Sequence, residues 1–136
     1  MSYAASFALQ AGIYAALRAD AALADLVGDA IYDALPAGAP PALYVSLGPE
    51  RATDRSDATG RGSLHRIEIS VISTGAGFGA AKAAAAAVGE ALEAPIALTR
   101  GVLVFLNFER AVARRAGRAG AERRIDLRFR ARVDAL

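Results

Sequence analysis

Residues 122–133 read Glu-Arg-Arg-Ile-Asp-Leu-Arg-Phe-Arg-Ala-Arg-Val, and this stretch decides the fold. Apolar and charged side chains alternate along it, which is typical of a β-strand with one buried and one solvated face. The apolar face carries Ile125, Leu127, Phe129 and Val133, and the charged face carries Arg124, Asp126, Arg128, Arg130 and Arg132. A sheet with one apolar and one charged face is most often antiparallel.

The same alternation appears upstream, over residues 64–73. One parity carries Ile67, Ile69 and Val71, and the other carries Arg66, Glu68 and Ser70. His65 shares the apolar parity, has no evident serine or cysteine partner, and is expected to be a hydrogen-bonded structural residue. Further strands are predicted over 42–47, from 102 to 109 with a continuation through Val112, and as short pieces from Ile31 and over 96–98.

Two segments have helical periodicity. Residues 7–19 carry Leu9, Ile13 and Leu17 on one stripe, and residues 77–93 form an alanine-rich helix. Asp20 is expected to cap a short turn over 21–27 that Gly28 ends. The predicted order is α-β-β-β-α-β-β-β. We therefore expect a single α+β domain over residues 1–136, with a mainly antiparallel sheet and two helices packed on its apolar face.

Composition narrows the possible functions. The 136 residues contain no cysteine and one histidine, which excludes disulfides, thiolate metal sites and sites with several histidines. No catalytic constellation is apparent, so we expect neither an enzyme nor a cofactor or metal. No stretch approaches the roughly 20 apolar residues of a membrane span. Residues 1–10 lack a basic start, which predicts no signal peptide and a cytoplasmic origin.

Charge is unevenly distributed along the chain. Residues 1–98 carry a net charge of −4, and residues 99–136 carry +6. Fifteen of the sixteen basic residues are arginine, which suits bidentate ion pairs and phosphate contacts. The split suggests partners of both signs.

Two further segments could carry chemistry. The run Gly75-Ala-Gly-Phe-Gly-Ala80 fits a dinucleotide-binding pattern between a strand and a helix, but the chain is too small for a doubly wound fold, so a plain turn is expected. Residues 48–62 have no period and are expected to form a long mixed-sign loop, which is either a protein-contact surface or a plain solvated loop rather than a metal site. The residues of this loop expected at the contact are Glu50, Arg51, Thr53, Asp54, Arg55 and Asp57.

Arginines also surround the hairpin predicted over 116–120. Arg114, Arg115 and Arg118 lie at it, and the charged face of strand 122–133 follows. Three interpretations stay open for this basic stripe: an interface with acids of a neighbour, a solvated face, or a surface that neutralises DNA phosphates.

The order of these features resembles a family of small tail proteins of long-tailed phages and phage-like gene transfer agents, which includes tail-completion and tail-terminator proteins. The resemblance rests on segments 9–17, 20–28, 31–36 and 41–48, on Thr53-Asp54, Thr59-Gly-Arg-Gly62 and His65, on Ala80-Ala-Lys82, and on the late arginine hairpin. It covers nearly the whole chain in order.

This resemblance implies a structural protein of a virion or phage-like particle, located in the tail neck and assembled in the bacterial cytoplasm. Tail terminators form a ring, usually hexameric, that stops growth of the tail tube at its head-proximal end. The implied partners are further copies of the chain, the tail tube protein, a head-side stopper or adaptor protein, and DNA passing through the lumen.

On this hypothesis the charged face of strand 122–133 meets a neighbouring subunit or the lumen. The loop after strand 42–47 and the hairpin at 114–120 would each meet an axial partner. Three alternatives remain: a head-side stopper or adaptor of the neck, a sequence-independent nucleic-acid-binding domain, and a small enzyme that uses the glycine turn.

Overall fold

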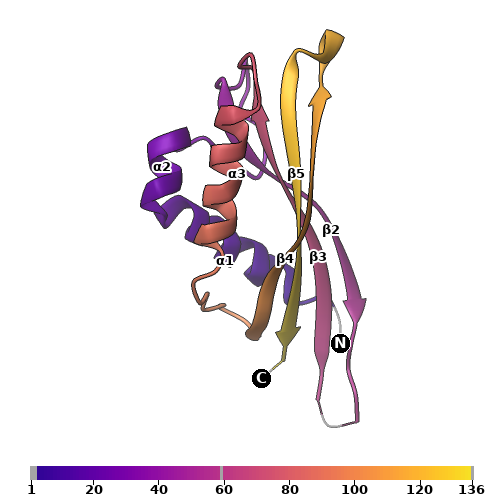
Figure 1. Ribbon diagram of the computed structural model, residues 1–136. Helices are drawn as coiled ribbons and strands as arrows, with labels where there is room; N and C mark the ends of the chain where they lie inside the picture. Colours follow the sequence, from indigo (N-terminus) through magenta and orange to yellow (C-terminus); the bar gives the residue numbers. More distant parts are fainter. Residues whose placement is uncertain (1–2, 59, 136) are drawn as a thin grey trace.

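The computed structural model describes residues 3–58 and 60–135 (Figure 1). Five strands form one sheet in the order β1-β2-β3-β5-β4. The elements are α1 (Ser6–Ala19), α2 (Ala21–Val27), β1 (Ile31–Tyr32), β2 (Leu43–Asp54), β3 (Gly62–Ser73), α3 (Gly79–Ala91), β4 (Val102–Ala116), the 3-10 turn η1 (Arg118–Gly120) and β5 (Glu122–Asp134). All three helices lie on one side of the sheet (Figure 1).

β3 is the central strand and sets the register of the sheet. It pairs antiparallel with β2 and with β5, and Ile69 lies opposite Leu127. β4 continues the antiparallel pattern beyond β5, whereas the two-residue β1 pairs parallel with β2. The expectation of an α+β domain with a mainly antiparallel sheet is confirmed.

The alternation in β3 and β5 separates the two faces of the sheet as predicted. Ile69, Val71 and Phe129 are at most 2% exposed and face the helices, on what we call the inner face. The opposite, outer face carries the charged positions. Burial of the apolar parity of both strands is the main stabilising contribution to this half of the fold.

The helices complete the core with small and aliphatic side chains. α1 buries Leu9, Ile13 and Leu17, as its periodicity predicts. α3 buries mainly alanines, so its axis can lie close to β3 and β5. The segment over 21–27 is a full helix rather than a turn, and the Asp20 carboxylate caps it by accepting from the backbone N–H of Leu23 at 2.9 Å.

The predicted loop over residues 48–62 is wrong in most of its length. β2 continues to Asp54 after a register shift between Leu47 and Glu50, and β3 begins at Gly62. Gly48 and Pro49 interrupt the alternation at this bulge, which concealed the strand in the sequence. The connection covers only 55–61, and Thr59 lies outside the described residues.

The short strand predicted over 96–98 is also wrong. Ile96 and Leu98 are half-buried in an irregular segment and pack on α1 at Gly12. A Cβ on Gly12 would lie 2.9 Å from a methyl carbon of each of them, so α1 approaches this segment through glycine. The two residues pack against the hydrophobic core but do not pair with a strand of the sheet.

Candidate functional site

The outer face of the sheet gathers the charged side chains of three strands. Arg124, Asp126, Arg128, Arg130 and Arg132 of β5 share this face, as their alternation predicts. The register adds residues that neighbour them on β3 and β4, namely Arg66, Glu68, Arg110 and Arg114. The result is a predominantly cationic surface on the side opposite the helices.

One end of the outer face is organised around Asp126. Its carboxylate accepts from Ser70 Oγ at 2.6 Å and from Arg124 Nε at 2.8 Å, and it lies 3.4 Å from Arg114 Nη2. Partial burial alone would raise the pKa of Asp126, but these hydrogen bonds and the two guanidinium charges lower it. Asp126 is therefore ionised and neutralises part of the cationic charge.

The middle of the outer face holds more cations than carboxylates: Glu109 Oε2 lies 3.6 Å from Arg66 Nε, and Glu68 lies opposite Arg128 across β3–β5. Arg110 lies directly opposite Arg128 across the β4–β5 pair, and Arg130 lies opposite Arg66 across β3–β5. The Arg130 guanidinium lies 5.3 Å from the ring centre of Phe105. Like charges in facing positions destabilise a sheet, so this arrangement is suited to an anionic partner.

The predicted contact residue Glu50 lies on the inner face and is engaged within the chain. Its Oε1 accepts from Ser6 Oγ at 2.6 Å and from the Tyr3 hydroxyl, and its Oε2 lies 3.0 Å from His65 Nδ1. Burial raises the pKa of Glu50, but the bonds from His65, Ser6 and Tyr3, with the charge of His65, lower it to about 2. The carboxylate ties the start of α1 to the sheet.

His65 has a serine partner that the sequence did not reveal. Ser63 Oγ lies 2.8 Å from His65 Nε2, so Ser63, His65 and Glu50 form the hydrogen-bonded order of a serine, a base and an acid. Ser63 is 3% exposed and His65 is 1% exposed. A nucleophile must reach a substrate, so burial makes this a structural network. The expectation that His65 is a hydrogen-bonded structural residue is confirmed. Ser63 precedes His65 by two residues on β3, so both side chains lie on the same face, and this spacing was the signal in the sequence.

The other predicted contact residues lie at opposite ends of the sheet. Asp54, Arg55 and Asp57 lie at the β2–β3 connection, with Arg51 and Thr53 preceding them on β2. Arg114, Arg115 and Arg118 lie at the β4–β5 hairpin, which points the other way along the strands (Figure 1). The molecule thus presents two separate charged tips.

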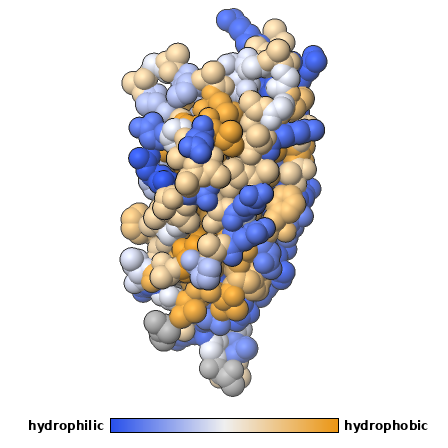
Figure 2. Space-filling view, turned by 60° about the vertical axis from the view of Figure 1, so that its left-hand side comes forward, coloured by the Kyte–Doolittle hydropathy of each residue, from blue (hydrophilic) through white to orange (hydrophobic). Residues whose placement is uncertain are grey.

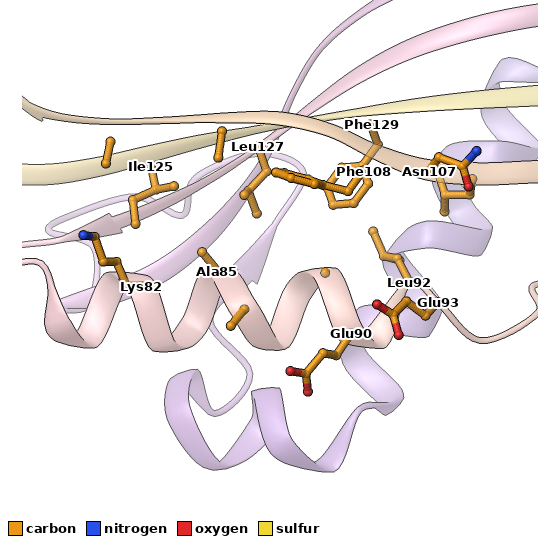
Figure 3. Close-up of a pocket in the computed structure, with 15 residues that line it drawn as sticks. Lys82, Ala85, Glu90, Leu92, Glu93, Asn107, Phe108, Ile125, Leu127 and Phe129 are labelled. Carbon is orange, nitrogen blue, oxygen red and sulfur yellow. The ribbon is translucent and has the colours of Figure 1, made fainter.

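A groove between α3 and β4 was not predicted. It encloses about 750 Å³, its floor is Ile125, Leu127 and Phe129, and its far wall includes Phe108, which is 57% exposed (Figure 3). Figure 2 shows apolar and small residues over much of this helix-bearing side, with charged residues between them. The only signal in the sequence was that residues 102–106, near the start of this strand, are apolar at both parities.

The glycine run at 75–80 connects β3 to α3. Gly75 donates its N–H to Ser73 Oγ at 3.0 Å, and the Ala76 carbonyl accepts from Arg123 Nη2 at 3.1 Å. These bonds within the chain fit a turn. Over residues 3–58 and 60–135, no group of three or more His, Cys, Asp or Glu side chains is placed to hold a metal ion. None of the described helices combines the length and apolar character required to cross a membrane.

Comparisons with known proteins give two findings. A family model described as tail completion protein gp17 matches residues 11–134. A chain in the solved structure "Virion of native gene transfer agent (GTA) particle" is 58% identical, with a TM-score of 0.93, over 98% of this chain and 100% of that chain. No curated protein matches the sequence.

Proposed function

The chain belongs to the family of tail completion protein gp17, and from this membership we propose that it is a virion structural protein that acts as a tail terminator. It forms a hexameric ring at the head-proximal end of the tail tube, stops polymerisation of the tube and joins it to a head-side connector. DNA passes through the lumen of the ring.

One observation carries this proposal. The chain is 58% identical, almost end to end, to a chain of a gene transfer agent virion. Such identity over the full length supports the same architecture and a corresponding place in a particle. It also favours a structural role over the nucleotide-dependent activity that the glycine run suggested.

The free edges of the sheet support a ring. In the described part of the chain, β4 has no strand partner on one side, and β1 covers β2 only at Val45 and Ser46, so the rest of β2 is open at the other edge. The two edges differ, so copies of the chain would join head to tail, which is the contact that closes into rings. β2 and β4 run in opposite directions, so a joint between copies would continue the antiparallel pattern.

This arrangement assigns the faces and the tips. Neighbours that meet along sheet edges leave the outer face free, and we place it toward the lumen, where Arg110, Arg128 and Arg130 face the DNA phosphates. The two charged tips then point along the ring axis. The tip at 54–57 and the tip at 114–118 meet the tail tube and the connector, one each.

Cryo-electron microscopy of the neck of the intact particle tests the proposal. We expect this chain in a closed ring on the last ring of the tube. A position next to the portal would instead make it a stopper or adaptor, and absence from the particle would contradict a virion role.

The nucleic-acid-binding alternative predicts a different result with the isolated protein. Tight, salt-sensitive binding to free duplex DNA would favour it, because binding by phosphate neutralisation weakens steeply as salt rises. A tail terminator that only guides DNA needs no such affinity.

A further inference from the structure

The helical layer leaves one strand of the sheet uncovered. α1 contacts β1, and α3 contacts β3 and β5, whereas the main neighbour of β4 is β5. The inner face of β4 therefore forms a wall of the groove, where Ala111, Ala113 and Phe108 are exposed (Figure 3). An apolar groove beside an unpaired strand edge is a common form of protein interface.

Gly89 provides a second observation. It lies inside α3 and lines the groove, and a Cβ added to it would meet no atom within 4 Å. Glycine within a helix is destabilising relative to alanine, so packing inside the chain gives no reason for glycine at this position. A bare backbone on the groove wall leaves room for an incoming side chain.

A matching protrusion lies at the opposite edge of the sheet. Phe7 on α1 is 81% exposed, the highest exposure of any large apolar side chain in the described part of the molecule. Its neighbour Ser6 is hydrogen-bonded to Glu50 of β2, which places Phe7 near the open stretch of β2. The groove and Phe7 therefore lie on opposite sides of the molecule, as a head-to-tail contact requires.

The chain itself supplies a fitting occupant, because its most exposed large apolar side chain lies at the sheet edge opposite the groove. α1 and β2 together carry no net charge, and the charged side chains that line the groove are Lys82, Glu90 and Glu93. The contact is therefore argued from the apolar floor of the groove and the exposed Phe7 ring, and a second copy brings the two together when the β2 edge meets the β4 edge.

We propose that the α3–β4 groove binds Phe7 of the next copy of this chain. The aromatic ring enters beside Gly89 and Phe108, and α1 of the incoming copy supplies the helix that the inner face of β4 lacks. The inference rests on the proposed ring and specifies the contact that holds its subunits together.

Cysteine cross-linking tests the contact directly, because the chain contains no cysteine of its own. The variant Phe7→Cys/Ala111→Cys, treated with a short bismaleimide reagent in purified particles or in concentrated protein, should give a ladder of covalent multimers. The matched control is Phe7→Cys/Val112→Cys. Val112 neighbours Ala111, is 44% exposed and lies on the outer face, so it should give little or no ladder.

A second measurement uses single substitutions at exposed positions. Phe7→Gln should weaken self-association at least tenfold in sedimentation velocity, whereas Gln10→Ala, on the same helix, should not. Circular dichroism melts confirm that each variant is folded.

The outcomes separate the contact from the ring. A ring seen in wild-type particles with the Phe7 side chain outside the neighbour's groove, or with another protein in the groove, overturns this inference and leaves the terminator proposal standing. Equal ladders from the Ala111 and Val112 pairs also overturn it. Absence of any ring contradicts the proposed function itself.

Discussion

Glu50 and His65 face each other on the inner side of the sheet, with 3.0 Å between carboxylate Oε2 and imidazole Nδ1. Glu50 follows the bulge in β2 and His65 lies on β3, and the same carboxylate accepts from Tyr3 and Ser6 at the start of α1. The pair therefore joins the start of the N-terminal helix to two strands through a partly buried polar network. Breaking it should loosen α1 from the sheet.

Acid should destabilise the protein through Glu50. Its pKa is about 2 in the folded chain and 4.5 as an ordinary glutamate, so the stabilisation is complete above about pH 4.5 and is lost as the pH falls toward 2. We expect Glu50→Gln to cost about 1–2 kcal/mol at neutral pH and to flatten the pH dependence in this range. Urea unfolding between pH 2.5 and 7 measures both effects, with the exposed Glu93→Gln as control. An unchanged acid profile in Glu50→Gln would assign the acid sensitivity to other carboxylates.

Ser63 should contribute to stability and not to chemistry. Ser63→Ala removes the hydrogen-bond partner of His65 Nε2, and His65 is only 1% exposed, so water cannot replace the lost bond. We expect the free energy of unfolding to fall by about 1–3 kcal/mol. Ser46→Ala, on the outer face of β2, should change little. A fluorophosphonate probe should leave native wild-type protein unlabelled, and labelling that Ser63→Ala abolishes would show that the network reaches a substrate.

Removing one arginine from the outer face should stabilise the isolated chain. Arg110 faces Arg128 across β4–β5, so Arg110→Gln should raise the free energy of unfolding by about 0.2–1 kcal/mol. Arg114→Gln, which removes a cation 3.4 Å from Asp126, should show no such gain. Thermal melts should show the difference shrinking as salt rises, because salt screens exposed charges. A gain that is independent of salt would argue against like-charge repulsion.

Charge reversal in the middle of the outer face should affect DNA passage more than assembly. If this face lines the lumen, Arg128→Glu/Arg130→Glu rings should have normal size, and the particles should deliver DNA less efficiently. Electron microscopy counts the rings, and a transfer assay measures delivery. Loss of the rings in this variant would place the two arginines in the subunit interface instead.

The sequence predicts best where periodicity is uninterrupted. β5 alternates over most of its length and β3 alternates over residues 66–71, so the faces of these stretches, including the five charged residues of β5, could be assigned correctly. The sequence pattern of β2 could not be followed past Gly48 and Pro49. The bulge there breaks the alternation of side chains between the two faces of the sheet, so the residues after it no longer follow the pattern of those before it. The segment around Ile96 and Leu98 has the pattern of a strand, but these side chains are half-buried by packing on α1, which a local pattern does not encode.

The residues predicted at the site differ in how much local sequence could reveal. The inward orientation of Glu50 depends on the same bulge, so its network with Tyr3, Ser6 and His65 was hidden. The α3–β4 groove arises from two elements that are distant in sequence and from the absence of a helix over β4. A strand that no helix covers is a property of the tertiary structure, so local sequence does not reveal it. The structure shows it through exposed aromatic residues such as Phe7 and Phe108.

The arginines along β4 oppose one way in which two copies of the chain could meet. β4 has fifteen residues, and its free edge could pair with β4 of a second copy. The product would be an edge-to-edge dimer in which neither β4 edge stays free. In such a pair centred on Val112, Arg110 of each copy would face Arg114 of the other on the outer face, and facing like charges disfavour that register. If copies join head to tail as proposed, this repulsion favours a joint between two different edges over a dead-end pair, and growth of the assembly then has a direction.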